Sequence, residues 1–340
     1  MAIRRFAPMF RQAGISIIEI MITLVLGLFI IGGALYTFLS TRTAFVTNDA
    51  IAKIQEDGRM VMERLTREIR QAGFLGCANS LDIPPKILSK TLPPTFAAGD
   101  GVRVFNDGTG WTNTTGVARV AGTDVIELKG MSSCTSKLDG NMTADNANIQ
   151  IVSNPCGWTA GAVLVIADCT SMDIFTATSV SKAAGKDTIA HASDVNIDNK
   201  LSKAYGKEAI VFGYGEKSFF VGMHPTLNLP MLYETSYNGT TTTANDVVAN
   251  VYDLQVLAVR ADSNADSAPD VTVTSTGSPP ALGGVTWSQA LSLQLRFSVR
   301  SESDNAGPSS STYTFNGASV TDKRIKRDFT TVIGIRNRLP

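Results

Sequence analysis

The sequence is poor in the residues with which most enzymes and metalloproteins work. Only two histidines, His191 and His224, and four cysteines occur in 340 residues, and no cysteines form a C-x-x-C pair, so a zinc site is not expected. The chain also lacks a G-x-S-x-G nucleophile elbow, an H-E-x-x-H helix, a phosphate loop and a dinucleotide fingerprint. We therefore expect no enzyme, and we interpret both histidines as surface or turn residues.

Charge is scarce as well. Lys plus Arg and Asp plus Glu both number 30, so the net charge is zero, and charged residues make up 18% of the chain. A balanced chain has no overall field to attract nucleic acid, so direct DNA binding is not expected. A local basic cluster is interpreted as a solvated strand edge; it comprises Lys323, Arg324, Lys326 and Arg327.

One long apolar run lies near the amino terminus. Residues 20–41 carry no charged side chain and, as a helix, would span roughly 33 Å, enough to cross a bilayer. Arg4, Arg5 and Arg11 precede the run and Arg42 follows it, which places the amino terminus in the cytoplasm. We predict a single-pass inner-membrane protein with its carboxy-terminal domain in the periplasm.

The small residue that would mark a cleavage site comes before the apolar run. A cut between Gly14 and Ile15 would remove a short basic leader and make Glu19 the fifth residue of the mature chain, one helical turn from the new amine. An ionised carboxylate in hydrocarbon is costly unless it is paired. We expect Glu19 to pair with an α-amino group, its own or that of a neighbouring subunit; the alternative is a glutamate lying at the membrane interface.

The stretch from Gly14 through Glu19, "GISIIE", resembles the class III signal of type IV prepilins. In that family a prepilin peptidase cuts after the glycine, the new amine is methylated, and the glutamate is retained. Most members have Phe where this chain has Ile15. The resemblance implies processing at Gly14 and Ile15, with Glu19 serving filament assembly.

An amphipathic pattern follows the apolar run. Its apolar positions recur at steps of three and four: Ile51, Ile54, Gly58, Val61, Leu65, Ile69 and Ala72. Gly73 is a suitable helix stop. We predict one helix over residues 15–72, roughly 85 Å long, whose second half lies on a globular domain.

Beyond the helix the pattern is that of short strands. We predict strands at 124–129, 162–167, 174–180, 208–214, 217–223, 231–234, 251–259, 290–300 and 327–336. A tight turn is expected at 214–217, and loops at 275–284 and 301–311.

The predicted fold is α+β, a long amino-terminal helix packed on a large antiparallel β-sheet domain. Its parts are a leader (1–14), a transmembrane or filament-core segment (15–41), an amphipathic helix (42–73) and a β-rich globular domain (74–340).

Segments at both ends narrow the resemblance. "EDGRMVMERLTREIRQAGFLGC" resembles the helix end of PilW-type minor pilins, and "VYDLQVLAVRADSNADSAPDV", "WSQALSLQLRFSVRSES" and "DKRIKRDFTTVIGIRNR" resemble their closing segments. The stretch between, 79–249, carries no such resemblance.

The resemblance implies a minor pilin that helps to prime type IV pilus assembly and sits at or near the pilus tip, at the cell surface. Its implied partners are the prepilin peptidase, other minor pilins, the major pilin, the inner-membrane assembly platform and a PilY-type tip adhesin. Adhesion, twitching motility and DNA uptake would follow from the filament. Two alternatives stay open, a J-type pseudopilin of type II secretion and a DNA-binding competence pilin.

The cysteines predict two disulfides in an oxidising compartment. They are Cys77, Cys134, Cys156 and Cys169. We favour the pairing that joins Cys156 to Cys169, because it closes a short loop and stabilises by about 3 kcal/mol, and Cys77 to Cys134.

Alternating oxygen-bearing side chains occur in one late loop. They are Asp262, Asn264, Asp266 and Asp270, a pattern that suits calcium, although the glycine and terminal glutamate of an EF-hand are missing. The alternative is a solvated turn rich in Asp and Asn. No other cofactor is expected.

Overall fold

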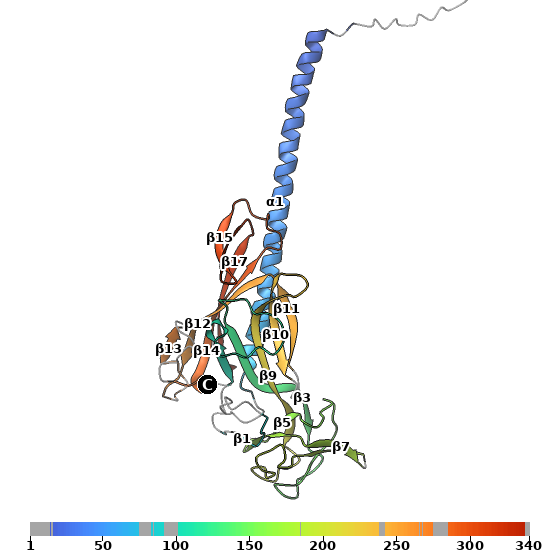
Figure 1. The fold of residues 1–340 in the computed structure, drawn as a ribbon, viewed down its shortest axis with the longest axis vertical. Coiled ribbons are helices and arrows are strands. Elements are labelled where there is room, and N and C mark those ends of the chain that lie inside the picture. The colour runs from blue at the N-terminus through green and yellow to red at the C-terminus, as the bar shows by residue number, and fades with distance from the viewer. Residues whose placement is uncertain are drawn as a thin grey trace, which may run out of the picture.

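The computed structural model describes residues 14, 16–74, 83, 85–91, 101–183, 185–237, 242–264, 266, 268–274 and 285–336. A single long helix at the amino end, α1 (Ile17–Gln71), extends far beyond a domain built of β-strands (Figure 1). The predicted α+β class, with a long apolar helix and a large, mostly antiparallel sheet domain, is confirmed.

Helix α1 has two halves with different surroundings. Its first half projects from the domain, whereas its second half buries the stripe expected from the sequence: Ile54, Gly58, Val61, Leu65 and Ile69. Its 55 residues make it about 80 Å long. The helix ends where predicted, because Gly73 adopts a left-handed φ of 73° and donates its N–H to the carbonyl of Lys129 at 2.7 Å.

The largest sheet contains eight strands of the described chain. They are β1 (Lys86–Ile87), β2 (Val102–Phe105), β3 (Val125–Lys137), β5 (Val163–Ala167), β6 (Met172–Thr176), β9 (Ile210–Met223), β10 (Pro230–Tyr237) and β11 (Thr242–Ala249). The order is β1-β6-β5-β9-β10-β11, with β3 between β2 and β9, and only β1 and β6 pair in parallel within these described strands. Strand β9 is therefore the centre of the sheet.

A four-stranded sheet packs against α1. Its order is β13 (Val271–Thr274), β12 (Val251–Ala261), β14 (Ala290–Arg300) and β17 (Lys326–Gly334). The ring of Phe329 on β17 stacks on that of Phe297 on β14, with centroids 5.2 Å apart. A Cβ at Gly58 would lie 2.2 Å from the Phe329 ring, so the missing side chain of Gly58 lets the helix approach this sheet closely.

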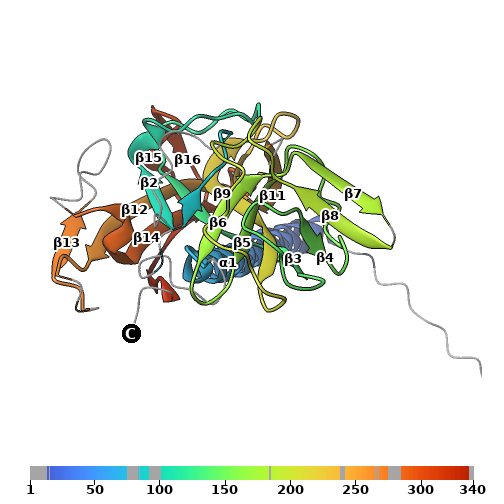
Figure 2. The same cartoon turned by 90° about the horizontal axis from the view of Figure 1, so that it is seen from below.

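Two smaller sheets complete the fold. Strands β15 (Ser311–Phe315) and β16 (Ala318–Asp322) form a hairpin, and β4 (Ile149–Ile151), β8 (Lys186–Ala190) and β7 (Ser179–Ala183) form a three-stranded sheet. Short 3-10 turns occupy η1 (Asn106–Gly108) and η2 (Trp287–Gln289). The three-stranded sheet lies at the end of the domain farthest from the projecting half of α1, and on the other side of the central strands from the four-stranded sheet (Figures 1 and 2).

Several strand predictions need correction. Residues 208–214 and 217–223 do not form two strands around a turn, because β9 runs through 214–217 with Gly215 opposite Gly130 of β3. The predicted strand 174–180 is instead the end of β6 and the start of β7. Strand 290–300 is observed as predicted, and the loop after it ends at Ser311, where β15 begins. The loop predicted at 275–284 lies outside the described residues.

Candidate functional site

The amino-terminal end of α1 brings together the residues of the predicted processing signal. Gly14 is exposed and lies outside the helix, and Ser16 is the residue before the first helical turn. Glu19 lies within that turn, where its N–H donates to the carbonyl of Ser16 at 3.0 Å. Ile15 lies outside the described residues. Gly14 thus lies outside the helix, Ser16 is extended, and Glu19 is helical.

The carboxylate of Glu19 is exposed. Within the described part of the chain no Lys or Arg nitrogen forms an ion pair with it. Its place in the first turn puts it beside the free N–H groups at the positive end of the helix dipole, which favours an anion. This end of α1 therefore offers an accessible carboxylate to a cation from outside the described residues.

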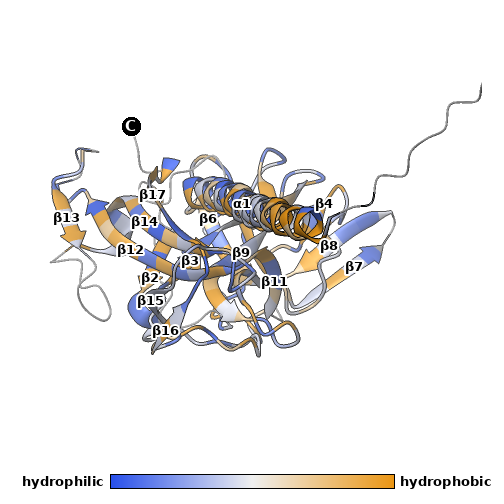
Figure 3. Ribbon diagram, turned by 90° about the horizontal axis from the view of Figure 1, so that it is seen from above, coloured by the Kyte–Doolittle hydropathy of each residue, from blue (hydrophilic) through white to orange (hydrophobic). Residues whose placement is uncertain are grey.

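The projecting half of α1 is apolar on all sides. Its large side chains are exposed, as Ile17 at 77% and Phe29 at 75% illustrate, and the most apolar 18-residue window has a mean hydropathy of 2.4 with no residue buried. Figure 3 shows the apolar colour around the whole projecting end. Among the described residues, α1 is the one helix long and apolar enough to cross a membrane. Such a surface needs either lipid or other apolar helices around it.

No protein-family model matches this chain, and no curated protein matches it.

A charged cluster holds the second half of α1 on the large sheet. Lys217 of β9 donates to Glu68 at 2.7 Å and forms an ion pair with Glu234 of β10 at 3.2 Å. Arg64 bridges the same two carboxylates, with its Nε 2.8 Å from Glu234 Oε2 and an Nη 3.3 Å from Glu68 Oε1. Burial raises the pKa of Glu68, but the Lys217 ammonium and the neighbouring arginines outweigh it, and the net pKa is lowered. The cluster fixes the direction in which α1 leaves the domain.

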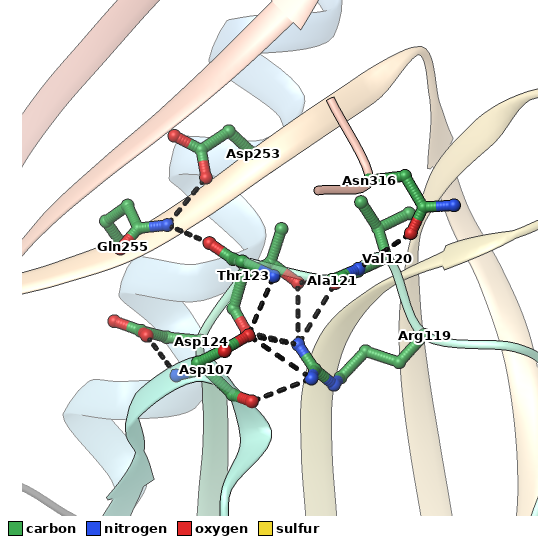
Figure 4. Close-up of polar contacts among 10 residues, drawn as sticks. Asp107, Arg119, Val120, Ala121, Thr123, Asp124, Asp253, Gln255 and Asn316 are labelled. Atoms are coloured by element: carbon green, nitrogen blue, oxygen red, sulfur yellow. Dashed lines mark hydrogen bonds and ion pairs between the residues drawn. The ribbon is translucent and has the colours of Figure 1, made fainter. Parts of the chain in front are cut away.

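A second polar cluster locks the long loop between β2 and β3 (Figure 4). Arg119 donates to the carbonyls of Thr123 at 2.6 Å and of Asp107 at 2.7 Å. Asp124 accepts the N–H groups of Asp107 and of Val256 on β12, at 2.9 and 2.7 Å. Burial raises the pKa of the Asp124 carboxyl. Because these hydrogen bonds join the loop to itself and to the strands, we assign the cluster a structural role.

The disulfides differ from the predicted pairing. Cys134 on β3 is bonded to Cys156, with Cα atoms 5.7 Å apart, so the predicted Cys156–Cys169 pair is wrong, and with it Cys77–Cys134. Cys169 is also disulfide-bonded, and Cys77 lies outside the described residues. The short sequence separation of Cys156 and Cys169 was misleading because β5 runs between them, whereas the sheet brings the end of β3 to the loop after β4.

The predicted calcium ligands lie in the connection from β12 to β13. Asp270 accepts the N–H and hydroxyl of Ser263 at 2.8 and 2.6 Å, and Asp266 accepts the N–H of Ala268 at 2.8 Å. Asn264 donates its N–H to Asp262 at 3.1 Å. In the described chain no three His, Cys, Asp or Glu side chains gather as a metal site. The carboxylates serve turn hydrogen bonds here, and calcium binding stays a prediction.

The basic cluster of the carboxy-terminal segment is only partly solvated. Lys323 and Arg327 are exposed, but Lys326 lies over the ring of Tyr313 at 4.0 Å and pairs with Asp322 at 3.0 Å. Arg324 also pairs with Asp322, at 3.4 Å. The interpretation as a solvated edge therefore fails for half of the cluster.

The two histidines have different places. His191 is 3% exposed, with its Nε2 3.0 Å from the carbonyl oxygen of Ala147, so its interpretation as a surface or turn residue is wrong. His224 is a turn residue as predicted, since its Nδ1 accepts the N–H groups of Thr226 and Leu227 at 3.2 and 3.0 Å.

Proposed function

We propose that this chain is a minor pilin of the PilW type, which is cleaved after Gly14 and built into a type IV pilus at or near its tip. The observation that carries the proposal is the placement of Gly14 outside the helix, three residues before α1 begins at Ile17, with Glu19 in the first turn of a helix whose first half is apolar and exposed. A pilin-like architecture would use this helix in the membrane first and in the filament core afterwards.

The proposed mechanism is one of assembly. Glu19 neutralises the α-amino group of an adjoining subunit as both leave the inner membrane, because neither charge is stable alone in an apolar surrounding. The apolar half of α1 then exchanges lipid contacts for contacts with the helices of other minor pilins and of the major pilin. The β-rich domain stays outside the filament core, where it helps to display a PilY-type adhesin.

Replacement of Glu19 tests this mechanism. Glu19→Ala leaves the partner's amine unpaired, so we expect about tenfold or more fewer pili by electron microscopy and loss of co-purification with the other minor pilins. Glu56→Ala is the matched control, because Glu56 is also an exposed glutamate of α1 but lies in its second half. Normal pili and normal complexes with Glu19→Ala would refute the role of this carboxylate.

A deletion separates the proposal from its nearest rival. Cells without this chain should lose pili and twitching motility while their type II secretion continues. Lost secretion with intact pili would instead identify a J-type pseudopilin.

A further inference from the structure

A groove runs along the exposed flank of α1, next to the end of β17. It has a volume of about 820 Å³ and is lined by helix residues from Arg59 to Gln71 and by Gly334 and Arg336 at the end of β17. Met62, which is half-buried, lies among them. The groove adjoins the charged cluster around Lys217 through Arg67, which lies 3.5 Å from Glu68, but none of its lining residues is used in the proposed function.

The groove is strongly basic although the whole chain is neutral. Four arginines line it, Arg59, Arg67, Arg70 and Arg336, against one carboxylate, Glu63. All four are exposed. Arg67 lies 3.5 Å from the neighbouring Glu68, and the other three form no ion pair within the described parts of the chain. A cluster of like charges of this kind attracts a ligand of opposite charge and complements it.

The strand beside the groove has an open edge. Strand β17 ends the order β13-β12-β14-β17, so among the described strands it has a partner on one side only. It is nine residues long, and Val332 near its end is 52% exposed. A strand edge of this length offers N–H and C=O groups to an added strand.

The size of the groove suits a short extended segment. From Arg59 to Arg70 the helix rises by about 16 Å, which is the length of about five residues in a β-strand. Side chains on one face of a strand recur about every 7 Å, so two carboxylates four residues apart lie about 13 Å from each other, close to the helical rise of about 12 Å from Arg59 to Arg67.

We propose that this groove binds an acidic, extended segment of a partner protein, which adds as a strand to the edge of β17 and pairs its carboxylates with Arg59, Arg67 and Arg70. The partner is recognised by two features together, alternating acidic residues and a free strand backbone. The inference goes beyond the proposed function and does not rest on it, because it concerns the second half of α1 and the edge of β17, and not Glu19.

The test uses the full-length chain in detergent micelles and a labelled probe. The probe is a capped peptide of alternating Glu and Val; a peptide of alternating Lys and Val is the control. We expect the acidic peptide alone to bind by fluorescence anisotropy, and Arg67→Glu with Arg70→Glu to weaken binding about tenfold or more. Arg260→Glu with Lys182→Glu makes the same charge change at exposed positions on β12 and β7, and binding should persist.

Hydrogen exchange then distinguishes strand addition from simple charge attraction. The bound peptide should slow the exchange of backbone amides in β17 of the wild-type chain. Three results would each overturn the proposal: no binding of the acidic peptide, equal binding by both double variants, or binding without protection of β17. If duplex DNA displaced the acidic peptide as well as unlabelled peptide does, and β17 amides were not protected, the groove would be a general site for polyanions and the proposal would be refuted. If a double variant fails to fold, peptide binding and amide protection in the wild-type chain still decide between the outcomes.

Discussion

At the scale of single residues, the carboxyl group of Glu216 shows how burial sets a pKa. Glu216 lies on β9 opposite Lys129 of β3, and Glu127 is close to both. Burial is the main cause that raises its pKa to about 7, and repulsion by Glu127 adds to it, while Lys129 and Arg103 act in the opposite direction. Folding therefore favours the protonated form of Glu216 over its carboxylate.

This shift predicts a pH dependence of stability. A carboxyl group whose folded pKa is raised stabilises the fold fully below its unfolded pKa, and that stabilisation is lost as the pH rises. The ordinary value is 4.5, so the loss spans about pH 4.5 to 7. We expect the free energy of unfolding to fall over this range by a few kcal/mol, and Glu216→Gln to remove that part of the fall.

The measurement is thermal unfolding of the full-length chain at several pH values. Glu208→Gln is the control, because Glu208 is exposed and close in the sequence. Parallel profiles for the wild type and Glu216→Gln would show that the carboxyl group is not perturbed.

At the scale of elements, the contact between α1 and the four-stranded sheet depends on one glycine. Gly58 occupies a turn of the helix directly over Phe329, whose ring is held in place by its stacking on Phe297. A methyl group at position 58 has no free space, so helix and strand would have to separate or the ring would have to leave its stack.

Gly58→Ala is therefore expected to destabilise the chain by about 1–3 kcal/mol, although alanine by itself favours a helix. Gly27→Ala is the matched control, because nothing lies within 4 Å of a Cβ there. Unfolding by urea, followed for both variants, gives the comparison. Equal or higher stability of Gly58→Ala would contradict the close approach of helix and sheet.

The elements also show which features the sequence predicts. Helix α1 follows from local spacing, because its apolar residues recur at the helical period and Gly73 permits the left-handed stop. The continuity of β9 does not follow from spacing, because Gly213 and Gly215 flank Tyr214 in a pattern typical of a turn. Pairing with β3, β5 and β10 keeps this segment extended, and those partners are distant in the sequence.

The disulfide pairing and the groove were missed for the same reason. Cys134 meets Cys156 only because of how β3 lies in the sheet, and Arg336 joins Arg70 only after the chain has folded. Arg64 and Glu68 are spaced as a helical ion pair, but their partners Lys217 and Glu234 come from β9 and β10. Local patterns predict elements, whereas contacts between elements need the topology.

At the scale of the whole molecule, the chain divides into an apolar rod and a β-rich domain with little overlap. The first half of α1 buries nothing, and the second half is held by an apolar stripe, by Gly58 and by the cluster around Lys217. Because the second half of α1 is held on the domain, the position of the apolar first half fixes the position of the domain. This rigidity is what a subunit needs if its helix lies in a filament and its domain at the surface.

The processing site tests this proposal most directly. Intact-mass and amino-terminal peptide analysis of the chain purified from pili or membranes should show a mature protein that begins at Ile15, with a methylated amine and with Glu19 as its fifth residue. A mature chain that keeps Gly14, or one cut after residue 41 so that the apolar half of α1 is lost, would contradict the proposed pilin function.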